Sequence, residues 1–76
     1  MSDPAAPQHV TVTVNGKAES LAAGTTLAQL LAQRKIRPEV VTVELNDAVV
    51  ERARFGGAVL RAGDRLELVF YMGGGA

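Results

Sequence analysis

The residues best suited to chemistry lie close to the C-terminus, although none of them has a reactive side chain. Gly73, Gly74 and Gly75 follow an apolar segment and precede a single Ala76. Ordering a glycine costs about 1–2 kcal/mol of backbone entropy, and these three have no side chain to bury in return. We therefore expect residues 72–76 to form a flexible tail. A carboxylate on so slim a tail can enter a narrow channel in a partner enzyme and react there with ATP.

Two interpretations of this tail stay open when it is considered alone. In the first, ATP converts the poorly electrophilic carboxylate into an acyl-adenylate, and glycine leaves its carbonyl carbon unhindered. In the second, the glycines are a frayed end without a function, as is common at chain termini.

Side chains that could act as catalysts are scarce in the remainder of the sequence. There is no cysteine, which excludes a thiolate nucleophile and a cysteine metal site, and a lone His9 rarely forms a metal site. We expect Glu44 and Glu67 to face solvent on neighbouring strands rather than to form a catalytic pair. Gly56-Gly57 lacks the lysine and the following helix of a phosphate loop. We therefore predict no catalytic residues, no metal site and no permanently bound cofactor.

Four arginines lie close together in the sequence, at positions 52, 54, 61 and 65. They can form an ordinary solvated surface. Alternatively, they can form a docking patch that steers association with an acidic partner. As candidate docking residues we name Arg52, Arg54, Tyr71 and Met72.

Length and composition limit the class of protein. The 76 residues suffice for one small domain, and 47% of them are apolar, as in a globular protein. Eight basic and eight acidic residues leave no net charge, which argues against a general nucleic-acid binder. Because there is no apolar signal region and no run of membrane-spanning length, we expect a cytoplasmic protein.

The N-terminal half predicts two strands and one helix. Residues 1–9 contain two prolines and are expected to be a disordered leader. Residues 10–14 alternate as a strand, and Asn15-Gly16 favours a type I′ turn into a second strand over residues 17–21. Thr26 and Gln29 fit a capping box, which predicts a helix over residues 26–36 that is ended by Pro38.

The C-terminal half predicts three further strands. They cover residues 41–45, 48–51 and 65–71, with a turn at Asn46-Asp47 between the first two. Residues 52–62 are expected to be irregular, with three side chains packed under the sheet, namely Phe55, Val59 and Leu60.

This element order predicts an α+β fold of the β-grasp (ubiquitin-like) type. One main helix would cover a mixed sheet of four to five strands, with the first and last strands side by side in its centre. The domain would span residues 10–71, and the last strand would direct the C-terminal tail into solvent.

Several segments together resemble the ThiS family, the β-grasp sulfur carriers of thiamine thiazole biosynthesis. These segments are "VNG" (14–16), "AAGTTLAQLL" (22–31), "VTVELNDAVVERARF" (41–55), "LRAGDRLELV" (60–69) and the glycine tail. The resemblance covers about residues 10–75 and rests on the order and spacing of the segments.

The resemblance implies a mechanism and its partners. A ubiquitin-activating-type (ThiF-like) adenylyltransferase would adenylate the terminal Gly-Gly carboxylate with ATP and magnesium. Sulfur derived from cysteine, passed through a persulfide, would replace AMP to give a thiocarboxylate, from which thiazole synthase takes the sulfur. By position Gly75 would carry the sulfur, Gly74 would precede it, and Gly73 and Met72 would form the approach.

Ala76 departs from the family pattern, in which the second glycine is usually the last residue. A peptidase could remove Ala76, the activating enzyme could tolerate it, or it could be foreign to the natural protein. The alternatives for function are a sulfur carrier for molybdopterin or another pathway, a ubiquitin-like protein modifier, and a plain binding module.

Overall fold

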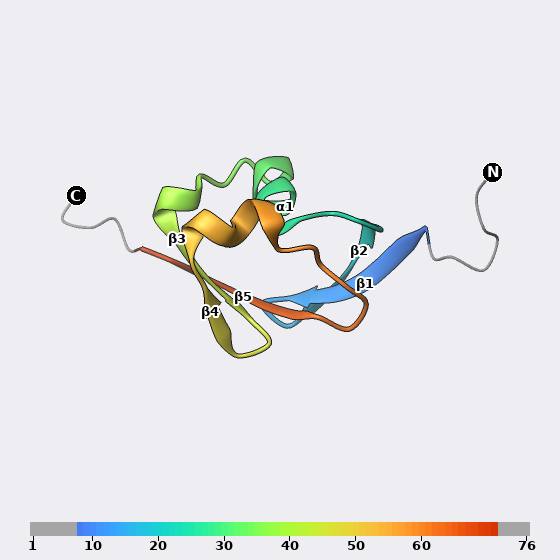
Figure 1. The fold of residues 1–76 in the computed structure, drawn as a ribbon. Coiled ribbons are helices and arrows are strands. Elements are labelled where there is room, and N and C mark those ends of the chain that lie inside the picture. The colour runs from blue at the N-terminus through green and yellow to red at the C-terminus, as the bar shows by residue number, and fades with distance from the viewer. Residues whose placement is uncertain (1–7, 72–76) are drawn as a thin grey trace.

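The computed structural model describes residues 8–71, which form a five-stranded mixed sheet with one α-helix on one of its faces (Figure 1). The strand order is β2-β1-β5-β3-β4. The strands are β1 (His9–Val14), β2 (Lys17–Ala22), β3 (Val41–Leu45), β4 (Ala48–Val50) and β5 (Arg65–Phe70). The predicted α+β, β-grasp arrangement is confirmed.

Two predicted segments fall largely outside the described residues, namely the leader over residues 1–9 and the flexible tail over residues 72–76. The structure corrects one boundary of the leader, because His9 belongs to β1 and pairs with Ala22 of β2.

The first and last strands lie side by side in the middle of the sheet, as predicted. β1 and β5 run parallel and pair through Thr13 with Arg65 and Val14 with Leu66. On its other side β5 pairs antiparallel with β3, from Val41–Phe70 to Leu45–Leu66. The last strand therefore has neighbours on both of its edges.

Two tight turns close the hairpins of the sheet. Asn15 and Gly16 have φ angles of 50° and 83°, and Asn46 and Asp47 have φ angles of 51° and 72°. A type I′ turn needs positive φ at both central positions, which asparagine, aspartate and glycine tolerate best. Both predicted turns are confirmed.

The helix α1 (Leu27–Gln33) begins where the sequence predicts. The Thr26 hydroxyl accepts a hydrogen bond from the Gln29 backbone N–H at 3.1 Å. In return, the Gln29 side-chain oxygen accepts one from the Thr26 N–H at 2.9 Å. Each side chain thus accepts a hydrogen bond from a backbone N–H that has no partner within the helix, which confirms the capping box.

The predicted end of the helix is wrong, because α1 stops at Gln33 rather than at residue 36. Lys35 adopts a φ of 58°, and the Ile36 N–H donates back to the Leu31 carbonyl at 2.9 Å. This turn brings the partly buried Ile36 against the core. Pro38 does not end α1 but begins a short 3-10 helix, η1 (Pro38–Val40).

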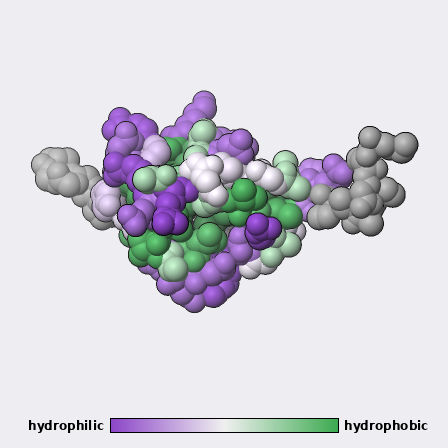
Figure 2. All heavy atoms as spheres, viewed as in Figure 1, coloured by the Kyte–Doolittle hydropathy of each residue, from purple (hydrophilic) through white to green (hydrophobic). Residues whose placement is uncertain are grey.

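The core lies between the sheet and a layer formed by α1 and the 3-10 helix η2 (Arg52–Gly57). Figure 2 shows hydrophobic residues still exposed between hydrophilic areas in this view. The buried hydrophobic residues are Val12, Val14, Leu21, Leu27, Leu30, Leu31, Val41, Val43, Phe55, Leu60, Leu66 and Leu68.

The segment after β4 contains one wrong core prediction. Phe55 and Leu60 are buried as expected, but Val59 is 41% exposed. Val59 lies opposite Thr26 in an isolated β-bridge, with hydrogen bonds on either side that tie this segment to the start of α1. Because side chains alternate along an extended segment, Leu60 points inward and Val59 outward.

Candidate functional site

The end of β5 is the point from which the chain enters the segment with the candidate sulfur-carrying residue. Tyr71, the last described residue, donates its backbone N–H to the Val40 carbonyl at 3.0 Å. Its phenol oxygen accepts a hydrogen bond from the Thr42 hydroxyl at 3.0 Å. Both contacts hold Tyr71 beside the beginning of β3, while Gly75 and the other predicted tail residues lie outside the described residues.

The middle of β5 is held by the side chain of Asn15, a role that sequence reasoning missed. The Leu68 N–H donates to Asn15 Oδ1 at 2.7 Å, and Asn15 Nδ2 donates to the Leu68 carbonyl at 3.3 Å. Asn15 also donates its own N–H to the Leu66 carbonyl at 2.8 Å. No local pattern could reveal this contact, because the two partners are 53 residues apart.

The start of β5 is held in a similar way by Asn46 from the other hairpin. The Arg65 N–H donates to Asn46 Oδ1 at 2.9 Å, and the Asn46 N–H donates to the Arg65 carbonyl at 2.8 Å. Asn46 Nδ2 also donates to Asp64 Oδ1 at 3.0 Å. Turn asparagines from both neighbouring hairpins therefore fix β5 and with it the point where the tail segment begins.

The four arginines do not form one cluster. Val50 of β4 pairs with Val43, so the chain beyond Val50 continues toward the Val41 end of β3, where Phe70 of β5 also lies. The exposed Arg52 and Arg54 of η2 are thus near the end of the sheet from which the tail segment leaves.

The other two arginines belong to the opposite end of β5. Arg65 begins the strand and forms an ion pair with Asp47 at 2.9 Å. The N–H of Arg61 donates to Asp64 Oδ2 at 2.8 Å in the turn before the strand. Of these four arginines, Arg52 and Arg54 therefore lie toward the end of β5 that leads to residues 72–76, and Arg61 and Arg65 lie at the other end.

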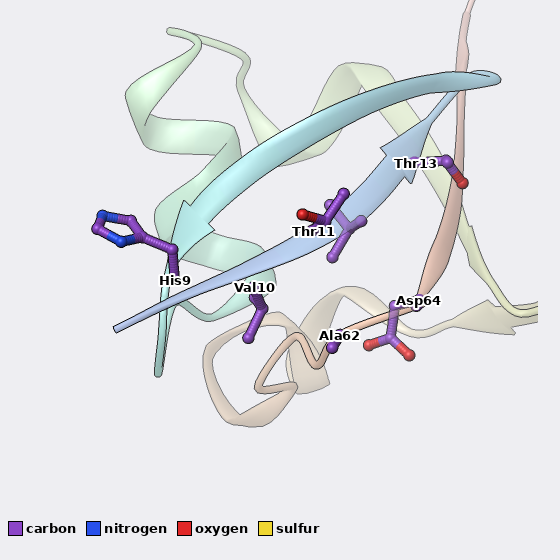
Figure 3. Close-up of a pocket in the computed structure, with 8 residues that line it drawn as sticks. His9, Val10, Thr11, Thr13, Ala62 and Asp64 are labelled. Atoms are coloured by element: carbon purple, nitrogen blue, oxygen red, sulfur yellow. The ribbon is translucent and has the colours of Figure 1, made fainter. Parts of the chain in front are cut away.

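A groove lies between β1 and the turn before β5, but its polar side chains are not placed to act together as catalysts (Figure 3). Its lining includes His9, Thr11 and Asp64, and Figure 3 shows the His9 ring directed away from the Asp64 carboxylate. Both Asp64 oxygens already accept hydrogen bonds, Oδ2 from the Arg61 N–H within the turn and Oδ1 from Asn46 Nδ2 of the β3–β4 hairpin. Because β1 and β5 are parallel, this groove lies at the end of β5 opposite to Tyr71.

Two other kinds of site are absent from residues 8–71. No group of three or more His, Asp or Glu side chains could hold a metal ion within this range. None of the helices in the same part of the chain is long and apolar enough to cross a membrane.

Comparison with protein families and curated proteins identifies similar chains. The model of the ThiS family matches residues 10–75. A thiazole synthase of Magnetococcus marinus is 45% identical over 62 residues, which are 82% of this chain and 19% of that protein. A thiazole synthase of Paramagnetospirillum magneticum is 30% identical over 63 residues, or 83% and 19% of the two chains. The chain thus spans 19% of the length of these curated relatives.

Two solved structures of a Geobacter metallireducens protein are also similar. The crystal structure of this thiamine biosynthesis protein (ThiS) superposes with a TM-score of 0.74 and 36% identity, covering 83% of this chain and 96% of that one. The NMR structure of a thiamine biosynthesis protein from the same organism gives a TM-score of 0.72 and 38% identity, covering 88% and 90%.

Proposed function

Because this chain belongs to the ThiS family, we propose that it is a sulfur carrier in thiamine biosynthesis. The observation that carries the proposal is the family match over residues 10–75, which includes the glycines beyond the described domain. The fold supports it, since β5 is fixed between two strands and leads directly into that segment.

The proposed reaction takes place on a C-terminal carboxylate and not on a side chain. A ubiquitin-activating-type adenylyltransferase uses ATP and magnesium to form the acyl-adenylate and release pyrophosphate. The terminal sulfur of a persulfide then attacks the acyl carbon and AMP leaves. A thiol cleaves the remaining S–S bond, which leaves the thiocarboxylate on the carrier. In this scheme the partners supply catalysis and the carrier is their co-substrate.

Gly75 is the proposed sulfur-carrying residue, preceded by Gly74 and Gly73. The family match ends at Gly75, so Ala76 lies beyond the matched residues. Either a peptidase removes Ala76 before adenylation, or the activating enzyme accepts one extra methyl group. These two routes give different products, which intact mass can separate.

Thiazole synthase is the proposed acceptor of the sulfur. Two relatives named thiazole synthase contain a segment similar to this chain within a much longer polypeptide. The presence of this similar segment in the same polypeptide as a thiazole synthase supports a partnership between the two as separate chains. This support favours transfer to thiazole synthase over transfer to the enzyme of another pathway.

The test is the formation of the thiocarboxylate. The chain ending at Gly75 is incubated with the activating enzyme, ATP, magnesium and a cysteine-derived sulfur donor, and intact mass is measured. We expect one oxygen to be replaced by sulfur, and no change when ATP is omitted. Conjugates of higher mass with lysine-containing proteins would instead indicate a protein modifier. If neither AMP nor sulfur ever appears on the chain, the proposed function is wrong.

A further inference from the structure

The face of the sheet opposite α1 has a surface that the domain leaves exposed. We call it the outer face and define it by six residues, Thr42, Glu44, Val49, Glu67, Val69 and Tyr71. Side chains alternate along each strand, so these residues point away from the buried Val43, Leu66 and Leu68. Three of the six are large apolar or aromatic residues that stay exposed, with Val49 at 65%, Val69 at 50% and Tyr71 at 58%.

Two carboxylates lie in the middle of this outer face. Glu44 of β3 is directly opposite Glu67 of β5, and Val49 of β4 is opposite Glu44 on its other side. The ion pairs among residues 8–71 are Arg34–Glu19 and Arg65–Asp47, so neither of these glutamates is in an ion pair there. Arg65 lies two residues before Glu67 on the same side of β5, but it pairs with Asp47. Like charges directly opposite each other destabilise a sheet. A cation placed between them would remove this repulsion.

The apolar residues lie where a docked surface would cover them together with the carboxylates. Val69 is opposite Thr42, in the row next to Glu44 and Glu67, and Thr42 is hydrogen-bonded to Tyr71. In such an interface the apolar contacts bury surface, and a pair of opposite charges at the centre adds specificity for one partner. The expected complement is therefore an apolar surface with one exposed arginine or lysine.

The position of the outer face relative to the tail indicates which partner binds there. Glu67 and Val69 are alternate residues of β5, and Tyr71 comes directly after the strand. The chain then continues into the tail segment, residues 72–76. A protein bound here would receive the tail beside its docking site. The similar segment within longer thiazole synthases supports that enzyme as the occupant.

We propose that the outer face docks thiazole synthase, with a basic side chain of the synthase between Glu44 and Glu67 and apolar residues over Val49 and Val69. The choice of partner rests on the proposed function. Arg52 and Arg54 belong to η2, in the layer on the opposite face of the sheet, so they are not part of this surface.

The experiment measures binding of the full chain to the thiazole synthase of the same organism by titration calorimetry. Glu67→Lys should raise Kd by about tenfold or more, because it places a lysine against the basic side chain of the synthase. Glu39→Lys in η1 is the control, since it makes the same charge change outside the outer face. Val69→Thr keeps the shape of the side chain but adds a hydroxyl, and should also weaken binding.

The stability of the variant separates docking from a structural role. Glu67→Lys replaces the like-charged pair by a pair of opposite charges, in which the new ammonium group faces Glu44. The thermal midpoint should therefore stay equal or rise while binding weakens. Equal binding of Glu67→Lys and the wild type, an equal loss in Glu39→Lys, or no binding of the wild-type chain would each overturn the proposal.

The outcome is independent of the sulfur-loading test. If the wild-type chain acquires sulfur but Glu67→Lys binds the synthase normally, the docking proposal fails and the carrier function stands. If sulfur never appears but Glu67→Lys selectively loses the synthase, the carrier function fails and the docking surface stands.

Discussion

The side-chain amide of Asn15 pairs with both backbone groups of Leu68 and so continues the contact between β1 and β5 beyond the end of β1. The amide oxygen and nitrogen replace the carbonyl and N–H that a longer strand would offer. Asn46 makes a comparable contact with Arg65 from the other hairpin. The residue that forms each turn therefore also holds the strand that leads to the tail.

This contact predicts a stability loss in Asn15→Gly. Glycine keeps the positive φ of the turn but leaves the Leu68 N–H and carbonyl without these partners, so the free energy of unfolding should fall by about 1–3 kcal/mol. Urea unfolding measures it. Asp47→Gly is the control, because it also places glycine at a turn position and removes an exposed ion pair worth about 0–1 kcal/mol. Equal losses in the two variants would contradict the role of the amide.

A second prediction separates the core from the tail. Leu68→Ala removes a buried side chain on the core face of β5 and should cost about 2–5 kcal/mol. Deleting residues 72–76 keeps all the buried hydrophobic side chains of residues 8–71, which lie between Val12 and Leu68, and should leave the thermal midpoint nearly unchanged. Thermal unfolding followed by circular dichroism compares the two. A truncated chain as unstable as Leu68→Ala would show that the tail contributes to the fold.

The elements were predictable where one short pattern determines them. Val10, Val12 and Val14 alternate, Asn15-Gly16 satisfies a turn, and Thr26 with Gln29 caps a helix, so each needs only its neighbours in the sequence. The predictions that were wrong concern features that depend on contacts between residues far apart in the sequence. Lys35 ends α1 early because Ile36 packs on the core, and Val59 points outward because its neighbours bond to the start of α1.

The candidate site was predictable only in its parts. Arg52 and Arg54 could be named from their residue type, but their position relative to β5 depends on strand pairing across the whole chain, and the role predicted for the glycines stays a prediction. The register of β4 on β3 brings the start of η2 to the end of β5, and it leaves Arg61 and Arg65 at the other end. The same pairing places Glu44 directly opposite Glu67. The sequence predicted these two residues on neighbouring strands, but the register that makes them direct partners depends on contacts across the chain.

A third prediction concerns docking to the activating enzyme. If Arg52 and Arg54 steer association, reversing both to glutamate should slow the on-rate and reduce its dependence on salt, because exposed charges act mainly on encounter. Stopped-flow fluorescence at several salt concentrations measures this. The control reverses Arg61, which lies at the other end of β5. On-rates equal to those of the wild type would assign Arg52 and Arg54 to an ordinary solvated surface.

The last prediction distinguishes the two routes past Ala76. Chains ending at Gly75 and at Ala76 are each incubated with the activating enzyme, ATP, magnesium and a sulfur donor, and their intact masses are compared. If a peptidase must remove Ala76, only the shorter chain gains sulfur, and the longer one does so after the alanine is cleaved. If the enzyme accepts the methyl group, both chains react equally.

Gly75→Val in the shorter chain tests why glycine is needed there. A branched side chain crowds both a narrow channel and the carbonyl carbon that the sulfur must attack, so neither AMP nor sulfur should be added. Gly75→Ala is the graded control, because its single methyl group reproduces the obstruction that Ala76 presents. If Gly75→Val is loaded as fast as the unchanged chain, steric access does not explain the glycines, and the activating enzyme must recognise the carrier by its folded domain alone.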